Sequence, residues 1–331
     1  MKKHIYIYSP SGAVRDKAAF RRGVARLTTL GHEVEIDADA LASCQRFAGD
    51  DTTRLAAIHR AAASGADVAL VSRGGYGLTR LLPQLRYKAI AKAIDRGMLF
   101  MGISDFTAFQ CAVLAKTGSV TWAGPALCEG FGVGGKPAGK SVAQASVTMA
   151  PDEIMEACFD DLLRGQGEGA GWRQPRVAVR SRQDQTNDMA TATTALSVSN
   201  AILWGGNLSV LTSLIGTPHF PQVKGGILFL EDIGEHPYRI ERMLTQLLRA
   251  GVLAQQKAIV MGQFTGYTLT PHDRGFNLNS VWSWLRRQIK VPVLTNLPYG
   301  HVQTKVLLPV GQKVDLVAED RDAMLFWGGS H

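Results

Sequence analysis

The stretch Leu99-Phe100-Met101-Gly102-Ile103-Ser104-Asp105-Phe106-Thr107-Ala108-Phe109 decides how this chain folds. An apolar run ends at Gly102, a serine and an aspartate follow, and the next residues have the composition of a helix. This order predicts a strand, a tight turn and a helix, with the side chain of Ser104 held at the edge of a sheet. Ser104 is then either a nucleophile or the cap of the helix that follows, which is a common position for serine.

Short apolar runs alternate with helical segments on both sides of this turn. Apolar runs occur at 5–8, 34–36, 68–71, 98–102 and 120–123, and helical segments between them include 16–30, 52–64 and 106–116. Strands separated by helices of this length indicate a parallel sheet with helices on both faces. Ligands of such sheets bind beyond the carboxyl ends of the strands. Gly74-Gly75 and Gly102–Ser104 end two successive strands, so we expect a shared cleft there.

The composition of the chain changes after residue 163. Residues 164–171 are rich in glycine, and the segment up to 198 is polar. We therefore predict an N-terminal α/β domain at 1–163, a linker with crossover strands at 164–198, and a smaller β-rich α/β domain at 199–331. In the last part we expect the segments 302–308 and 313–316 to form paired strands.

Composition excludes several classes of function. The chain has 331 residues, of which 46% are hydrophobic and 19% charged, and no apolar run approaches the roughly 20 residues of a membrane span. The N-terminal apolar run is too short for a signal peptide, so we expect a cytoplasmic protein that does not contact membranes. The four cysteines form no C-x-x-C pair, so we expect no structural zinc site and no disulfide framework.

The net charge of +8 permits nucleic-acid binding but does not establish it. The basic residues are spread over helical segments such as 15–26 and 286–290, without the aromatic residues that a single-strand binder interleaves among them. We interpret them as solvated helix faces, and we expect no nucleic-acid partner. The positive charge can still help to attract a small anionic substrate.

A serine nucleophile needs an oxyanion hole, and two candidate donors can be named. The tight turn leaves the backbone N–H of Asp105 directed into the site, where it can stabilise a developing negative charge. Gly74-Gly75 can bring a second N–H close to a ligand because these residues carry no side chain. Donors of this kind are typically worth about 3 kcal/mol each in the transition state.

The serine also needs a base and a group that orients it. His301 follows Gly300 in a loop between two strands, where functional side chains are often presented. Glu231 and Asp232 end a strongly apolar run, and a carboxylate there can orient a histidine. As alternatives, His301 is structural, and the acids pair with Arg239 or Arg242 on the next helix.

At these residues the sequence resembles the LD-carboxypeptidase family of serine peptidases, over nearly its whole length. The shared motifs include Ser9-Pro10-Ser11-Gly12, Ser72-Arg73-Gly74-Gly75-Tyr76-Gly77, Gly102–Ala108, Gly124-Pro125, Trp204-Gly205-Gly206-Asn207-Leu208, residues 214–218, Leu230-Glu231-Asp232 and Gly300-His301. The segment 164–198 matches the family least. Each motif alone is weak, but together they are specific.

The resemblance implies a Ser104–His301–Glu231 triad with an oxyanion hole at the amides of Asp105 and Gly75. It implies a first domain similar to class I glutamine amidotransferases, a smaller β-rich second domain and a homodimer. The expected reaction removes the terminal D-alanine from murein tetrapeptide in peptidoglycan recycling, without metal or cofactor. We also expect Arg73, Gly74, Trp204 and Asn207 to bind the small anionic peptide, since the guanidinium of arginine suits carboxylates.

Two rival functions remain. The family includes self-immunity hydrolases of the microcin C type, which cleave peptide–nucleotide antibiotics. An aromatic residue near the cleft that could stack on a base would favour that function, and Trp172 and Trp204 are candidates. The other rival is a peptide-binding protein without catalysis, which would require that Ser104, Glu231 and His301 do not converge.

Overall fold

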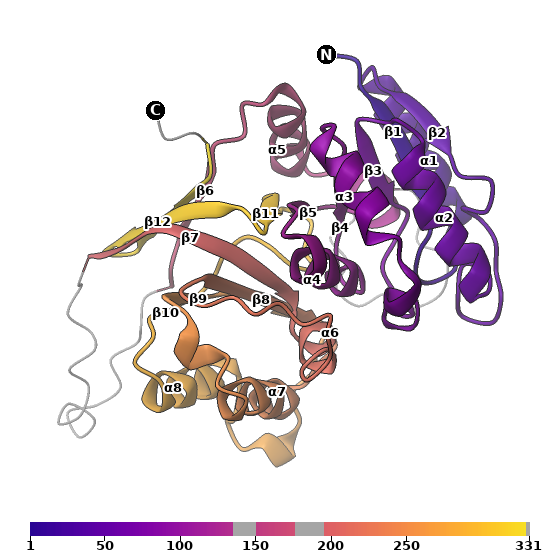
Figure 1. Ribbon diagram of the computed structural model, residues 1–331. Helices are drawn as coiled ribbons and strands as arrows, with labels where there is room; N and C mark the ends of the chain where they lie inside the picture. The colour runs from indigo at the N-terminus through magenta and orange to yellow at the C-terminus, as the bar shows by residue number, and fades with distance from the viewer. Residues whose placement is uncertain (135–149, 176–194, 329–331) are drawn as a thin grey trace.

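Two β-sheets form the framework of the protein in a computed structural model that describes residues 1–134, 150–175 and 195–328 (Figure 1). The first sheet has the strand order β11-β5-β4-β3-β1-β2 and the second β10-β9-β8-β7-β12-β13-β6. The predicted mixed α/β architecture, with a parallel-rich N-terminal domain and a C-terminal domain, is confirmed.

The first sheet is parallel except for its last strand. Its members are β1 (His4–Tyr8), β2 (Glu33–Ile36), β3 (Val68–Val71), β4 (Leu99–Gly102), β5 (Thr121–Ala123) and the antiparallel β11 (Leu308–Val310). The helices of this half of the chain are α1 (Lys17–Thr29), α2 (Asp51–Ala63), α3 (Tyr87–Asp95), α4 (Phe106–Thr117) and α5 (Glu153–Arg164).

Alternation along β1 explains why helices cover both faces of this sheet. Successive side chains of a strand point to opposite faces. Ile5 and Ile7 pack in the core that includes residues of α1 and α5, whereas Tyr6 and Tyr8 pack in the core that includes residues of α2, α3 and α4. A strand buried on both faces is apolar at nearly every position, which is why β3 reads Val-Ala-Leu-Val.

The second sheet is parallel on one side and antiparallel on the other. Its parallel part consists of β10 (Val293–Leu294), β9 (Ala258–Thr265), β8 (Ile227–Ile233) and β7 (Leu196–Asn207), and its antiparallel part of β12 (Lys313–Glu319), β13 (Asp322–Phe326) and β6 (Gly169–Arg173). The helices α6 (Leu208–Ser213), α7 (Pro237–Arg249) and α8 (Leu278–Gln288) accompany the parallel strands (Figure 1).

The pairing expected for residues 302–308 and 313–316 is wrong. Residues 302–307 form no strand, and β11 pairs with β5 in the first sheet. The strand β12, which follows a turn at Gly311, pairs with β7 and β13 in the second sheet. The chain thus passes from one sheet to the other within a few residues.

The domain boundaries that the sequence analysis placed after residues 163 and 198 stay a prediction.

Helix α4 joins the two halves. All residues from Phe106 to Val113 are buried, and the helix packs against α3 and β5 of the first half and against α6 and β7 of the second. A helix that is apolar on all sides lies inside a core. The turn at its N-terminus, which carries Ser104, is therefore held by both domains.

Candidate active site

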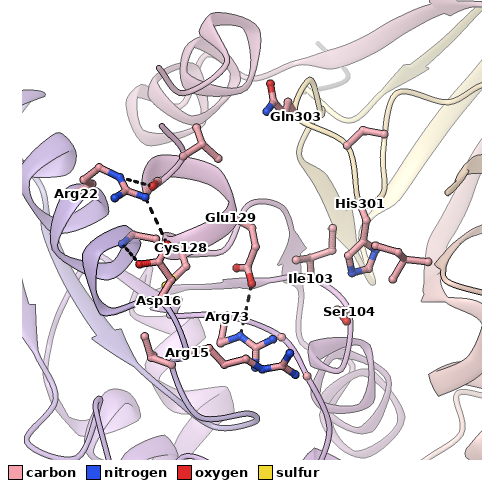
Figure 2. A pocket seen from close by; sticks show the side chains of 18 of the residues that line it. Arg15, Asp16, Arg22, Arg73, Ile103, Ser104, Cys128, Glu129, His301 and Gln303 are labelled. Carbon is pink, nitrogen blue, oxygen red and sulfur yellow. Dashed lines mark hydrogen bonds and ion pairs between the residues drawn. The ribbon is translucent and has the colours of Figure 1, made fainter. Parts of the chain in front are cut away.

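A cavity of about 1090 Å³ lies next to this turn. Its lining includes Arg73, Gly74, Gly75, Ser104 and His301, which come from both halves of the chain (Figure 2). A second cavity of about 580 Å³ also reaches Ser104, Gly75 and Asp105, and it includes Asn207. Ser104 thus lies where two cavities meet.

The backbone of Ser104 is strained. Its φ is 68°, which lies in the left-handed region that residues other than Gly, Asn and Asp seldom adopt. Such a conformation costs about 1–3 kcal/mol and persists only where the surrounding structure imposes it. Asp105 precedes the first residue of α4, but its side chain forms no capping hydrogen bond. The alternative that Ser104 simply caps a relaxed helix therefore does not account for this geometry.

The loop of Gly74 and Gly75 lies directly against the serine. A Cβ atom added to Gly74 would come within 2.7 Å of Ser104 Cβ and 2.9 Å of its Oγ, so only glycine fits at this position. Gly75 has a φ of 128°, and the Gly12 N–H donates a hydrogen bond to the Gly74 carbonyl at 3.3 Å. Among the described residues, no acceptor receives the N–H of Gly75 or of Asp105. Both amides are thus available to a ligand.

The side chain of Asp105 connects this loop to the turn that carries Ser104. Its carboxylate is 1% exposed and accepts a hydrogen bond from the Leu78 N–H at 2.9 Å. Burial raises the pKa of Asp105, and hydrogen bonds from Leu78 and from the Ser11 side chain act in the opposite direction. One side chain therefore fixes three segments that meet behind Ser104.

His301 and Glu231 are in direct contact. His301 Nδ1 lies 2.8 Å from Glu231 Oε2, and the Glu231 side chain is 0% exposed at the end of β8. An ionised carboxylate only accepts, so Nδ1 carries the proton and the ring's Nε2 is left free as a base. Gly300 permits this approach, because its φ is 141° and an added Cβ would come within 3.3 Å of Glu231 Cβ. In Figure 2 the His301 ring lies beside Ser104 in the cavity.

The contact with Glu231 raises the pKa of His301. Burial lowers it, but the hydrogen bond and the negative charge of Glu231 raise it by more. The imidazolium that forms when His301 accepts a proton is thereby stabilised.

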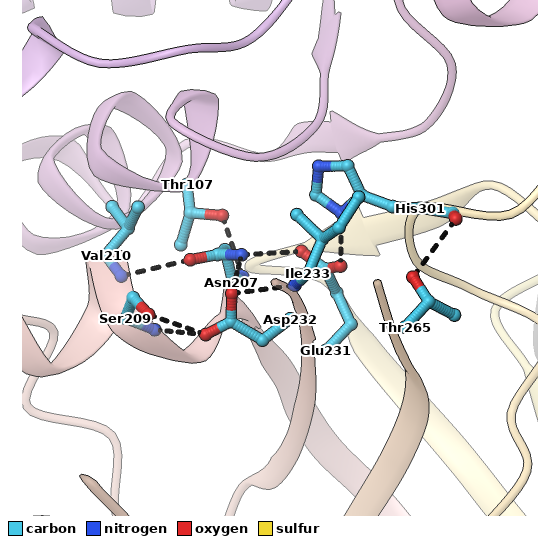
Figure 3. A network of polar contacts seen from close by, with 9 residues as sticks. All are labelled: Thr107, Asn207, Ser209, Val210, Glu231, Asp232, Ile233, Thr265 and His301. Atoms are coloured by element: carbon cyan, nitrogen blue, oxygen red, sulfur yellow. Dashed lines mark hydrogen bonds and ion pairs between the residues drawn. The ribbon is translucent and has the colours of Figure 1, made fainter. Parts of the chain in front are cut away.

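A polar network supports Glu231 from behind (Figure 3). The Asn207 amide nitrogen donates to Glu231 Oε1 at 3.2 Å and to Asp232 Oδ1 at 2.9 Å. Asp232 also accepts from the N–H and hydroxyl of Ser209 at 2.9 and 2.7 Å. Burial raises the pKa of Asp232. The carboxylates therefore engage this network, and neither forms the ion pair with Arg239 or Arg242 that was the alternative.

The residues expected to bind substrate are found in different places. Arg73 and Gly74 line the larger cavity, and Arg73 Nε lies 3.6 Å from Glu129 Oε1. Asn207 touches the smaller cavity, but its amide is committed to the two carboxylates. The structure does not support substrate binding by Trp204, because this residue is 1% exposed and its indole N–H donates to the Gln256 side chain. A side chain in the core has no surface to offer a substrate.

Sequence reasoning missed most of the charged residues of the larger cavity, which are Arg15, Asp16, Arg22, Arg46, Glu129 and Lys305. Glu129 lies on the π-helical turn Leu127–Phe131, and Lys305 lies in the segment between His301 and β11. Lys305 is only 3% exposed. A lysine just before an apolar run is normally solvated, so the sequence carries no signal for its burial.

Two general properties of the described residues bear on function. No helix among them is both long enough and apolar enough to cross a membrane. In the same ranges, His, Cys, Asp and Glu side chains form no group of three or more that could hold a metal ion.

A strained serine beside a histidine bound to a buried carboxylate, in a cleft between two α/β domains, is the arrangement of a serine hydrolase. Residues 5–124 match the LD-carboxypeptidase N-terminal domain and residues 200–316 the LD-carboxypeptidase C-terminal domain. The chain belongs to the LD-carboxypeptidase family of serine peptidases.

Three individual relatives have names that belong to this family. A muramoyltetrapeptide carboxypeptidase structure from Oxalobacter formigenes is 34% identical, with a TM-score of 0.80, over 98% of this chain and 99% of that one. The murein tetrapeptide carboxypeptidase of Pseudomonas aeruginosa is 30% identical, over 72% of this chain and 69% of the relative. The microcin C7 self-immunity protein of Escherichia coli is 27% identical, over 75% of this chain and 70% of that protein.

Proposed function

We propose that this protein removes the terminal D-alanine from murein tetrapeptide, with Ser104 as nucleophile, His301 as general base and Glu231 as the residue that orients the base. The observation that carries the proposal is the pairing of His301 Nδ1 with buried Glu231 at 2.8 Å in the cavity that Ser104 lines. The names of the Oxalobacter and Pseudomonas relatives supply the substrate class.

The reaction has two steps. His301 Nε2 takes the proton of the Ser104 hydroxyl while Oγ attacks the carbonyl carbon of the scissile bond. The N–H groups of Asp105 and Gly75 donate to the oxyanion. The intermediate collapses when the C–N bond breaks, and the leaving D-alanine amine receives the proton from His301. A water molecule, deprotonated by His301, then attacks the acyl-enzyme, which releases the shortened peptide and regenerates Ser104.

The test is release of D-alanine. The purified protein is incubated with murein tetrapeptide, and free D-alanine and tripeptide are measured by mass spectrometry. We expect both products from the wild type and none above background from Ser104→Ala. Equal release by the two proteins, or none by the wild type, would show that the proposal is wrong.

The microcin-type function is the second candidate, because a self-immunity protein is among the relatives. Both tryptophans that could stack on a base are buried. Trp172 is 8% exposed and donates its indole N–H to the Thr295 carbonyl, and Trp204 is 1% exposed. This burial excludes these two tryptophans as stacking residues, whereas Tyr76, which is 46% exposed, lines the smaller cavity. Incubation with an aminoacyl sulfamoyl adenosine tests the alternative, which predicts faster cleavage of that compound than of the tetrapeptide.

We also infer the setting of the reaction from the family resemblance. The protein acts in the cytoplasm, as a homodimer, in the recycling of cell-wall peptides. Light scattering coupled to size exclusion tests the dimer, and a monomer mass at all concentrations would contradict it. Accumulation of tetrapeptide in the cytoplasm of cells that lack the protein tests its role in recycling.

A further inference from the structure

Lys305 is a charged group in the wall of the cavity that Ser104 lines. Its side chain is 3% exposed and lines the cavity together with Ser104 and His301. Among the described residues, no carboxylate lies within the 4.0 Å of an ion pair to its ammonium, and no acceptor hydrogen-bonds it. Burial lowers the pKa of Lys305, against the more distant charges of Glu129, Glu231 and Asp152. The stem of Lys305 is buried while its ammonium faces the cavity, so an anionic ligand group bound there would be its partner.

Glu129 supplies the opposite charge in the same cavity. Its side chain is 49% exposed, and within the part of the chain that the structure describes it forms a single ion pair, the long contact of 3.6 Å with Arg73. Figure 2 shows Glu129 reaching into the cavity, with Arg73 on one side and His301 across from it. Burial raises the pKa of Glu129, and the positive charges of Arg73, His301 and Lys305 offset only part of this increase. The carboxylate therefore retains free lone pairs for a cationic ligand group.

We propose that Lys305 and Glu129 form a subsite for an amino acid head group, in which one carbon carries both a free carboxylate and a free ammonium. The head group is the far end of the diamino acid whose carbonyl Ser104 attacks, so this inference rests on the proposed function. Lys305 binds the carboxylate, and Glu129 binds the ammonium.

Other parts of the peptide fit this pair of charges less well. The terminal D-alanine offers only a carboxylate, because its nitrogen belongs to the scissile bond, and Glu129 would repel it. A lysine side chain offers only an ammonium, which would leave Lys305 buried without a partner. Only a group with both charges satisfies both residues. Lys305 is thus a specificity-determining residue for diamino acids that keep a free carboxylate.

The experiment compares two tetrapeptides that differ at the third residue, meso-diaminopimelate or L-lysine. We expect the wild type to prefer the diaminopimelate peptide at least tenfold in kcat/KM. Lys305→Met should lose at least tenfold on that peptide, mainly through KM, and change less than threefold on the lysine peptide. Glu129→Gln should weaken both, because both peptides carry the ammonium. Lys290→Met, at an exposed lysine, is the matched control and should change neither.

Stability separates this role from a structural one. Methionine has nearly the length of lysine and needs no ion pair, so Lys305→Met should keep or raise the melting temperature. A marked fall would show that the ammonium already has a partner within the protein, which would overturn the proposal. An equal loss on both peptides would do the same.

Calorimetric titration of Ser104→Ala with each peptide measures the preference without turnover. The subsite is supported if the diaminopimelate peptide binds more tightly and if Lys305→Met abolishes this difference. This holds even if no D-alanine is released, and the proposed function then fails alone. Equal binding of the two peptides overturns the subsite even if D-alanine is released from both.

Discussion

At the scale of residues, the contact with Glu231 sets the protonation state of His301, the proposed base. A raised pKa means that His301 still carries a proton at the pH of about 6.5 where a free histidine is half protonated. Its neutral, basic form predominates at higher pH than that of a free histidine. In the proposed mechanism, Glu231 therefore makes His301 a stronger base and holds its tautomer.

The pH dependence of activity should report this shift. We expect the acidic limb of kcat/KM for the wild type to have its midpoint above 6.5, because the charge of Glu231 raises the pKa of His301 more than burial lowers it. Glu231→Gln removes the charge and keeps the burial, so the midpoint should fall below 6.5 and kcat should drop. A variant midpoint at or above that of the wild type would contradict the assigned role of Glu231.

Gly74→Ala tests the contact behind the nucleophile. The new Cβ would lie 2.7 Å from Ser104 Cβ, so either the serine or the loop must move. A displacement of about 1 Å can cost on the order of 100-fold in rate, and we expect a loss of that size in kcat. Gly171→Ala is the control, since its Cβ would meet Met324 at 3.6 Å, an ordinary contact. Unchanged kcat in Gly74→Ala would show that the loop is not fixed against Ser104.

At the scale of elements, the start of α4 depends on a side chain that binds another segment. Asp105→Ala leaves the buried N–H of Leu78 without an acceptor, which should lower the free energy of unfolding by about 1–3 kcal/mol. We also expect kcat to fall, because the Gly74–Gly75 loop is no longer tied to the nucleophile turn. Denaturant unfolding and steady-state kinetics measure the two effects.

Asp105→Asn separates geometry from charge. The amide oxygen can still accept from Leu78, so both stability and kcat should recover most of the loss. Asp95→Ala, at an exposed position near the end of α3, should change neither. If Asp105→Asn is as slow as Asp105→Ala, the loop is held by something other than this hydrogen bond.

The same scale shows what the sequence could predict. Alternating apolar runs and helices predicted the parallel sheet, since each run is a local pattern. The return of β11 to the first sheet was missed, because pairing with β5 joins residues that lie far apart in the chain. Likewise Glu231 and His301 were individually recognisable, but their contact spans 70 positions of sequence. The left-handed φ of Ser104 and the burial of Lys305 have no local signal at all, since both are imposed by tertiary packing.

At the scale of the whole molecule, the site exists because two domains are held in register. Thr107 lies three residues after Ser104. Asn207, which ends β7, donates a hydrogen bond to Glu231. The Asn207 N–H donates to Thr107 Oγ1 at 3.0 Å, and both side chains are at least 96% buried. A Cβ added to Gly206 would lie 2.5 Å from Thr107 Oγ1, so the two backbones are close at this point. This hydrogen bond therefore links the half that carries Ser104 to the half that carries Glu231 and His301.

Thr107→Val should loosen that link while it preserves the shape of the side chain. The Asn207 N–H loses its acceptor, which should lower the free energy of unfolding by about 1–3 kcal/mol. If the bond also keeps Ser104 and His301 aligned, kcat/KM should fall about tenfold, the equivalent of about 1.4 kcal/mol in the barrier. Thr245→Val, which removes a hydroxyl bonded within α7 to the Glu241 carbonyl at 2.8 Å, is the matched control and should affect kcat/KM less than twofold. A loss of stability without a loss of kcat/KM would mean that packing around α4 alone sets the alignment of the two domains.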